Sequence, residues 1–221
     1  MFEMLNKTKD WLLDILFPKF CFGCGKEGLY ICKGCEVFLS EIENTIPGLT
    51  SVWEYDGLME KLIHKIKFDG RYHIIGELIE KALEKIDLKL PDDTIITYVP
   101  MWKKKERRRG FNQSELIARK LGQLLGFAEQ SLLEKVRDNR SQVGLGPRER
   151  LENVKDVFQT NFQFFPLRGI SRRETIFNFK NALLVDDVYT TGATMKECAK
   201  VLRKAGVKNV YGFTLARKMR L

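Results

Sequence analysis

The sequence predicts an α/β domain with a mostly parallel sheet, preceded by a small cysteine-rich module. Four of the five cysteines lie between positions 21 and 35. Beyond about residue 50, strand-like apolar runs alternate with segments of helical periodicity, which is typical of parallel strands joined by helices. Near the C-terminus an apolar run leads through a polar turn into a helical pattern. We therefore predict two parts, a front module over 1–49 and an α/β domain over 50–221.

The elements of the α/β domain can be placed in chain order. Residues 51–55 predict the first strand, and apolar residues at helical spacing follow over 58–66 and again over 75–86. Residues 94–99 predict a buried strand that ends at Pro100. A helix with apolar positions between 116 and 125 comes next, and Gly126 is suited to cap its C-terminus.

Two further stretches, residues 137–155 and 160–180, lack periodicity and predict long loops. Loops of that length in a compact domain are usually functional or disordered.

The composition indicates a negatively charged binding partner but does not say which kind. Of the 221 residues 44% are hydrophobic, enough for a sizeable core, and 38 Lys plus Arg against 29 Asp plus Glu give a formal charge of +9. Such a charge favours nucleic acid, phosphorylated metabolites or anionic lipid.

The apolar run over 11–17 is broken by Asp14 and ends at Pro18. It is too short to cross a bilayer and lacks a signal cleavage site. We predict no transmembrane segment and a cytoplasmic location. The run is predicted to form an amphipathic helix over the module, and the alternative is a helix at the inner face of the membrane.

The cysteines of the front module have the spacing of a metal site. Cys21 and Cys24 form one C-x2-C pair, and Cys32 and Cys35 form a second, seven residues on. Two such knuckles supply four thiolates for a tetrahedral zinc ion, with no position left open, so the sequence predicts structural Zn²⁺ in a zinc ribbon-like module. Two disulfides are the alternative, disfavoured in the cytoplasm. Cys198 lies apart on an apolar helix face and is predicted to be a buried thiol.

The strongest functional signal is the segment from 182 to 195. An apolar strand is followed by Asp186 and Asp187, then by a turn over 189–194 that contains three threonines, then by a helix. Backbone N–H groups and hydroxyls of such a turn can surround one anion at a helix N-terminus, and Gly192 permits close approach. The two carboxylates can accept hydrogen bonds from vicinal sugar hydroxyls. The segment therefore predicts a site that holds both ends of a ribose phosphate.

This segment resembles the phosphoribosyl pyrophosphate signature of type I phosphoribosyltransferases. The resemblance implies the type I phosphoribosyltransferase fold and a reaction through a cationic ribose centre, with Mg²⁺ held by pyrophosphate and ribose hydroxyls. Asp186 and Asp187 would be catalytic mainly through electrostatics, and neither is assigned as a general base. The implied phosphoribosyl pyrophosphate-binding residues of the turn are Tyr189, Thr190, Thr191, Gly192, Ala193 and Thr194.

A dense basic run follows the strand over 94–99. Residues 103–109 hold six cations in seven positions, in a place suited to a pyrophosphate loop. We assign Arg109 and Gln113 to phosphoribosyl pyrophosphate. For the lysines at 103–105 a solvated basic surface is the alternative interpretation.

The stretch from Arg109 to Gln113 is similar to the Arg-Gly-Phe-Asn-Gln signature of the ComF family. Further similarities lie at 55–57, 65–70, 142, 149–150 and 153–154, and in the cysteines. The stretch over 160–180 is longer than this family usually has. The loop residues Gln142 and Arg150 are candidates to close over pyrophosphate or, equally, to tie down their own loop.

ComF-like proteins are associated with natural transformation, so the resemblance implies a cytoplasmic accessory of DNA uptake. Such a protein would bind single-stranded DNA and phosphoribosyl pyrophosphate and meet proteins of the uptake machinery. The alternatives are an active phosphoribosyltransferase of nucleotide salvage and a zinc module that docks proteins. Cations and aromatic rings suit single strands, and the residues assigned to DNA are Trp102, Lys103, Lys104 and Lys105.

Overall fold

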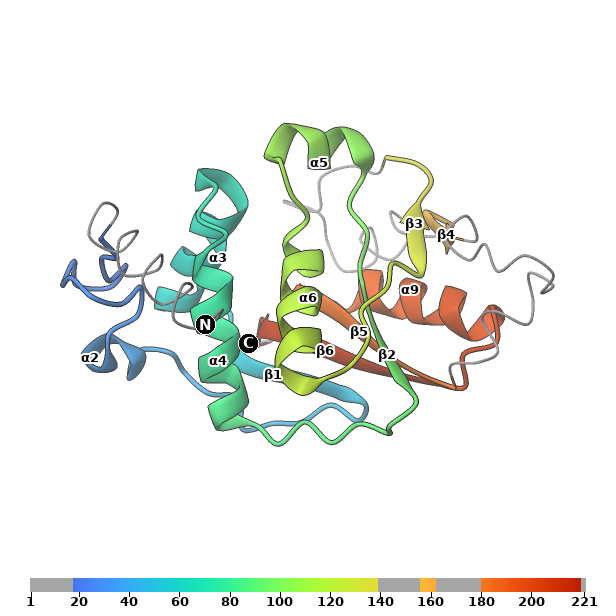
Figure 1. Ribbon diagram of the computed structural model, residues 1–221, viewed down its shortest axis with the longest axis horizontal. Helices are drawn as coiled ribbons and strands as arrows, with labels where there is room; N and C mark the ends of the chain where they lie inside the picture. Colours follow the sequence, from blue (N-terminus) through green and yellow to red (C-terminus); the bar gives the residue numbers. More distant parts are fainter. Residues whose placement is uncertain (1–17, 139–155, 162–179, 220–221) are drawn as a thin grey trace, which may run out of the picture.

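The computed structural model describes residues 18–138, 156–161 and 180–219 (Figure 1). The predicted N-terminal helix over 1–17 and the greater part of both predicted loops, with Gln142 and Arg150, lie outside these ranges. In chain order the elements are α2 (Lys33–Glu36), β1 (Leu49–Glu54), α3 (Gly57–Asp69), α4 (Ile74–Lys85), β2 (Thr94–Tyr98), α5 (Lys103–Arg109), α6 (Gln113–Leu125), β3 (Leu133–Lys135), β4 (Phe158–Thr160), β5 (Asn181–Tyr189), α9 (Ala193–Lys204) and β6 (Asn209–Arg217).

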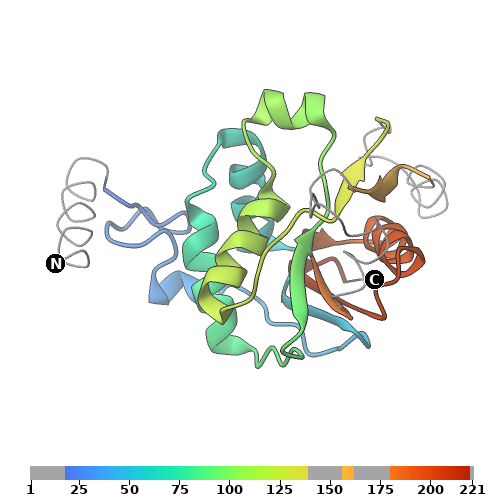
Figure 2. The same cartoon turned by 45° about the vertical axis from the view of Figure 1, so that its right-hand side comes forward.

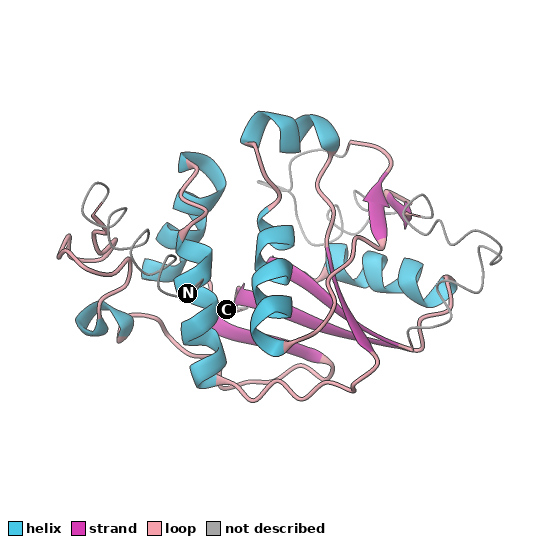
Figure 3. Cartoon of the chain, viewed as in Figure 1, coloured by secondary structure: helices cyan, strands magenta, loops and turns pink. Residues whose placement is uncertain are grey.

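Four parallel strands form the main sheet in the order β1-β6-β5-β2 (Figure 3). The connection from β5 to β6 runs through α9, and the connection from β2 to β5 includes α5 and α6. Strands β3 and β4 form a separate antiparallel pair. The predicted mostly parallel sheet with flanking helices is confirmed.

Helices cover both faces of the sheet. Side chains along β5 alternate between the two faces, so each face has apolar residues that a helix can bury. Leu183 and Val185 join the core formed with α3, α4 and α6. Ala182 and Leu184 join a second core with Cys198 and other residues of α9. Figure 2 shows α9 on one side of the sheet and α4 and α6 on the other. Cys198 is fully buried, as predicted.

The local signals at α6 act as expected. The Asn112 side chain caps its N-terminus by accepting a hydrogen bond from the Ser114 N–H at 3.1 Å. Gly126 ends the helix in the left-handed region with φ of 77°, which costs glycine little.

The basic run departs from its prediction as a loop. Residues Lys103–Arg109 form the short helix α5, which ends at Gly110 with φ of 88°. Lys, Arg and Glu are good helix formers, and a left-handed glycine permits the stop.

The front module packs closely against α3 and α4. Ile31 and Leu39 belong to the main core, with exposed fractions of 0% and 5%. The Glu77 carboxylate of α4 accepts hydrogen bonds from the backbone N–H groups of Ile31 at 2.8 Å and Tyr30 at 3.0 Å. An ion pair of 2.6 Å joins Lys81 to Glu36. The division at residue 49 coincides with the beginning of β1 and stays a prediction.

No helix within the described ranges is long and apolar enough to span a bilayer.

Candidate functional site

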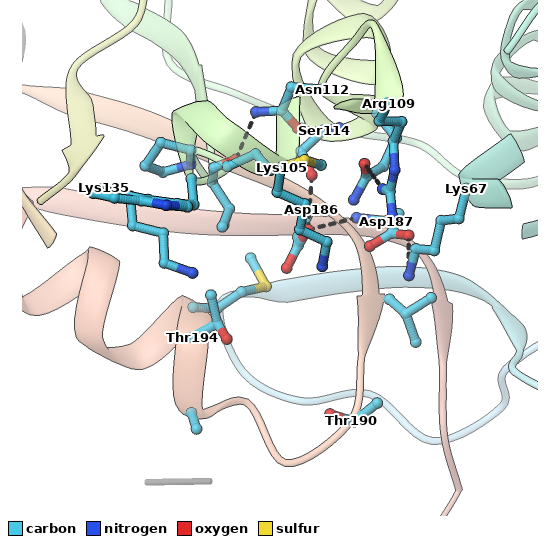
Figure 4. A pocket seen from close by; sticks show the side chains of 18 of the residues that line it. Lys67, Lys105, Arg109, Asn112, Ser114, Lys135, Asp186, Asp187, Thr190 and Thr194 are labelled. Carbon is cyan, nitrogen blue, oxygen red and sulfur yellow. Dashed lines mark hydrogen bonds and ion pairs between the residues drawn. The ribbon is translucent and has the colours of Figure 1, made fainter. Parts of the chain in front are cut away.

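A cavity of about 830 Å³ opens where the strands β2 and β5 end (Figure 4). The turn from β5 into α9 lines one side, and α5 with the beginning of α6 lines another. The C-terminal end of α3 supplies Lys67 and Phe68. Segments widely separated in sequence therefore surround one space at the carboxyl edge of the parallel sheet, the usual position of ligand sites in open α/β folds.

The cavity has an excess of positive charge. Among the described residues its lining holds six cationic side chains, Lys67, Lys104, Lys105, Arg108, Arg109 and Lys135, against three carboxylates, Asp138, Asp186 and Asp187. Such a lining attracts a polyanion more strongly than the surface at large, because the walls exclude water and focus the field.

Asp186 is held by two hydrogen bonds at the end of β5. Its Oδ1 accepts from the Ser114 hydroxyl at 2.8 Å and from the Asp187 N–H at 2.9 Å. Burial and the neighbouring Asp187 charge raise the pKa of Asp186 to about 7, although the Ser114 bond opposes that rise. The Asp186 carboxyl is therefore poised to exchange its proton near neutral pH.

Asp187 is buried and paired with a cation. Its Oδ2 lies 2.5 Å from the Lys67 ammonium, and its side chain is 9% exposed. Burial alone would lower the pKa of Lys67, but attraction to the Asp187 carboxylate outweighs it and raises that pKa. The ion pair therefore offsets the cost of burying the Lys67 ammonium.

The turn after β5 forms a compact helix N-terminus. Gly192 has φ of 75° and is the N-cap of α9. A Cβ there would lie 2.1 Å from the Tyr189 hydroxyl, so the position accepts only glycine unless Tyr189 moves. The Thr191 hydroxyl accepts a hydrogen bond from the Ala193 N–H at 3.4 Å. All six assigned turn residues, 189–194, line the cavity, where the N–H groups of the first helical turn favour an anion.

The residues assigned to pyrophosphate come from the opposite wall. The Arg109 guanidinium donates to the Gln113 side-chain oxygen at 2.6 Å and lies 5.6 Å from the centre of the Phe68 ring. Asn112 lies between these two residues in the sequence. Its side chain donates to the Val99 carbonyl at 3.1 Å and so ties the beginning of α6 to the end of β2. Arg109 and Gln113 thus face the same cavity as the acidic pair.

Three of the four residues assigned to DNA line this same cavity. Trp102, Lys104 and Lys105 line the cavity together with the turn after β5, whereas Lys103 does not. Burial lowers the pKa of Lys105, and the nearby charges of Arg109 and Lys67 add to this. Because the run is a helix, part of its basic side faces the cavity.

Sequence reasoning missed two partners of the acidic pair. Lys67 lies in the stretch over 65–70 that resembles the ComF family, but the resemblance gives this residue no role. Ser114 follows the Arg-Gly-Phe-Asn-Gln signature directly. Both reach the aspartates only through the packing of α3 and α6, and the signal that could have found them is their position next to recognised motifs.

The four cysteines of the front module meet at one point. Their Sγ atoms all lie within 4.8 Å of one another, and Cys24 Sγ is 3.6 Å from Cys32 Sγ. Tetrahedral zinc at about 2.3 Å from each sulfur would set the sulfurs about 3.8 Å apart. A Cβ at Gly23 would lie 2.6 Å from Cys35 Sγ, so the knuckle closes tightly around the sulfurs. This cluster can hold a metal such as zinc.

Comparison with known proteins identifies a domain family and several relatives. Residues 107–220 match the model of the phosphoribosyl transferase domain family. Competence protein F of Haemophilus influenzae is 30% identical over 209 residues, covering 91% of this chain and 85% of that protein.

Two more relatives cover most of the chain. The DNA utilization protein YhgH of Salmonella typhimurium is 32% identical over 179 residues, which are 77% of this chain and 72% of that protein. Competence protein ComFC of Streptococcus pneumoniae is 30% identical over 198 residues, 89% of this chain and 80% of that protein. The chain therefore belongs to the ComF family of phosphoribosyl transferase-domain proteins, with a cysteine cluster that fits a zinc-binding module in front.

Proposed function

We propose that this protein binds phosphoribosyl pyrophosphate in the cavity and serves, on the cytoplasmic side, as a single-stranded DNA-binding accessory of DNA uptake. The observation that carries the ligand assignment is the shared cavity. The Asp186–Asp187 pair, the turn over 189–194 and the basic wall from α5 surround one space. The names of the relatives, competence proteins and a DNA utilization protein, support the role in DNA handling.

Each wall of the cavity suits one part of phosphoribosyl pyrophosphate. The turn after β5 offers N–H groups to the 5′-phosphate, and the carboxylates can accept the ribose hydroxyls. Arg109 and Lys105 face the pyrophosphate. Mg²⁺ would be held mainly by pyrophosphate and ribose oxygens, since it prefers hard oxygen ligands, and it would screen the charge between the phosphates.

Zinc in the four-cysteine cluster would be structural. Cys21, Cys24, Cys32 and Cys35 supply four sulfurs, which fill a tetrahedral ion. The ion would hold the first knuckle to the second, which the hydrogen bond from Ile31 to Glu77 joins to α4. Proteins of the DNA-uptake machinery are the partners that we propose from the association of the ComF family with natural transformation.

Calorimetry with phosphoribosyl pyrophosphate and Mg²⁺ tests the cavity assignment. The double variant Asp186→Ala, Asp187→Ala should bind at least about one to two decades more weakly, because hydrogen bonds to the sugar are lost. Asp87→Ala is the control, since Asp87 is 75% exposed and does not line the cavity. Equal affinity of the wild type and the double variant would refute the assignment.

An active phosphoribosyltransferase is the second candidate. The cavity also has apolar wall at Phe68, Met101 and Trp102, which offers room for an acceptor base beside the ribose. Incubation with phosphoribosyl pyrophosphate, Mg²⁺ and a panel of bases and amines, with pyrophosphate release as readout, separates the two. Acceptor-dependent release favours an enzyme of nucleotide salvage, and its absence across the panel favours the binding role.

A further inference from the structure

A continuous row of aromatic rings links the front module to the entrance of the cavity. Neighbouring ring centres are 6.0 Å apart for Phe22 and Tyr30, and 4.8 Å apart for Tyr30 and His73. They are 6.0 Å apart for His73 and Tyr72, and 5.3 Å apart for Tyr72 and Phe111. We call these five residues the ring row. They come from the module, from the turn between α3 and α4, and from the segment before α6.

The ends of the ring row are anchored and its centre is exposed. Phe22, Tyr30 and Phe111 pack against the main core and are half-buried. Tyr72 is 52% exposed, and His73 is exposed as well. Rings that served only to fill a core would be buried throughout, so burial does not account for the exposed centre.

The turn that carries the exposed rings is held by its backbone. Gly70 ends α3 with φ of 67°, and the Tyr72 carbonyl accepts from the Ile75 N–H at 3.0 Å. His73 stands at the N-cap of α4 without a side-chain capping bond, so its imidazole has no capping role. Partial desolvation by the neighbouring rings and backbone lowers the pKa of His73, and the charges of Arg71 and Lys19 add to the effect.

The ring row ends beside the cavity. Phe111 directly precedes Asn112, which lines the cavity. Phe68 lines it too, is 64% exposed, and has the Arg109 guanidinium 5.6 Å from its ring centre. An exposed aromatic surface therefore leads from the cysteine module to the site proposed for phosphoribosyl pyrophosphate.

Cations accompany the rings. The Lys61 ammonium donates to the Phe22 carbonyl at 2.7 Å on the exposed side of α3, and Arg71, also exposed, precedes Tyr72. The nearby Asp69 carboxylate is paired with Lys65 at 2.6 Å, which offsets its charge. Exposed π-faces beside cations are the chemistry that binds single-stranded nucleic acid, because bases stack on the rings while phosphates meet the positive charges.

We propose that the ring row is a stacking surface for a single-stranded nucleic acid, with phosphates along Lys61 and Arg71. The proposal rests on the proposed function in DNA handling and moves its main contact from Trp102 and the lysines of α5 to the face between the module and the cavity. A nucleic acid is the proposed partner because exposed rings and cations lie together on this face. A protein partner on the same rings is an outcome of the test.

Fluorescence anisotropy on the full-length protein separates base stacking from charge. Two labelled probes of equal length are used, an oligothymidine and an abasic strand that keeps the phosphates. The variant Tyr72→Ala, His73→Ala should lose about tenfold or more in affinity for oligothymidine and keep its affinity for the abasic strand. Tyr72→Phe, which retains the ring, should bind as the wild type does. Phe38→Ala is the control, since Phe38 is 66% exposed and stands outside the ring row.

Each result has one meaning. Wild type that binds neither probe overturns the DNA part of the proposed function, and this inference falls with it. A second result is a wild type that prefers oligothymidine and a double variant that binds both probes as the wild type does. That result overturns the inference alone and assigns the rings to another partner. Equal loss for both probes also overturns it, because the rings would then act through fold or charge. Circular dichroism and calorimetric titration with phosphoribosyl pyrophosphate confirm that each variant is folded.

Discussion

Glu77 fastens the second cysteine knuckle to the α/β domain, and its substitution gives a sharp test of that attachment. Its two carboxylate oxygens accept from the Ile31 N–H at 2.8 Å and from the Tyr30 N–H at 3.0 Å, directly before Cys32. Glu77→Gln keeps one acceptor oxygen and turns a donor toward the other N–H group. Loss of one charge-assisted bond should lower the free energy of unfolding by about 2 to 3 kcal/mol. For a chain of 221 residues this lowers Tm by about 4 to 12 °C.

The measurement is thermal unfolding of the zinc-loaded protein, followed by the rate of zinc release to a chromophoric chelator. Glu80→Gln is the matched control on the same helix, because Glu80 is 55% exposed and its partner is Lys120 at 2.6 Å. An exposed ion pair contributes less than about 1 kcal/mol, so this variant should stay close to the wild type in both assays. Equal Tm values for Glu77→Gln and Glu80→Gln would refute the reasoning.

Three further predictions concern metal, protons and the basic helix. Protein purified without chelator should hold one zinc per chain by metal analysis, and Cys21→Ser or Cys32→Ser should lose it; a zinc-free wild type would contradict the site. Phosphoribosyl pyrophosphate should bind more tightly as pH rises through about 7, the pKa of Asp186, because the ionised carboxylate accepts the sugar hydroxyls. Ser114→Ala removes a hydrogen bond that lowers the pKa of Asp186. Calorimetry on this variant should therefore find that the affinity rises at higher pH than in the wild type, and an unchanged pH profile would oppose the role given to Asp186. Lys105→Ala should weaken the binding of phosphoribosyl pyrophosphate, since Lys105 lines the cavity; retained affinity would leave Lys105 to the DNA contact assigned from the sequence.

Local sequence signals predicted those parts of the site that a single segment builds. In the run from β5 through the turn into α9, local residue types predict the structure: apolar residues form the buried strand, acidic residues stand at its end, and Gly192 takes the left-handed position. Lys67 and Ser114 could not be assigned in this way. Lys67 precedes Asp187 by more than a hundred positions, and only the tertiary fold brings its ammonium, near the end of α3, to 2.5 Å from the carboxylate at the end of β5.

The basic run shows a second limit of sequence reasoning. Charge density alone indicated a surface, but it does not say which way each side chain points. Once residues 103–109 form a helix, neighbours in sequence diverge by about 100° around its axis. Lys104 and Lys105 consequently line the cavity while Lys103 does not. The helical periodicity of the run is the signal that separates these side chains.

Ile31 and Leu39 show that the front module belongs to the core rather than standing beside it. The clustering of cysteines favoured a boundary near residue 49, because composition changes there. Yet the two side chains, 0% and 5% exposed, share a cluster with Trp53 and Leu78. Burial of such a side chain contributes about 1.5 to 3 kcal/mol, so these two contribute about 3 to 6 kcal/mol. That is a large part of the 5 to 15 kcal/mol typical of a whole domain. Loss of the metal should therefore weaken the α/β domain together with the module, because unfolding the knuckles uncovers the apolar surface between α3 and α4.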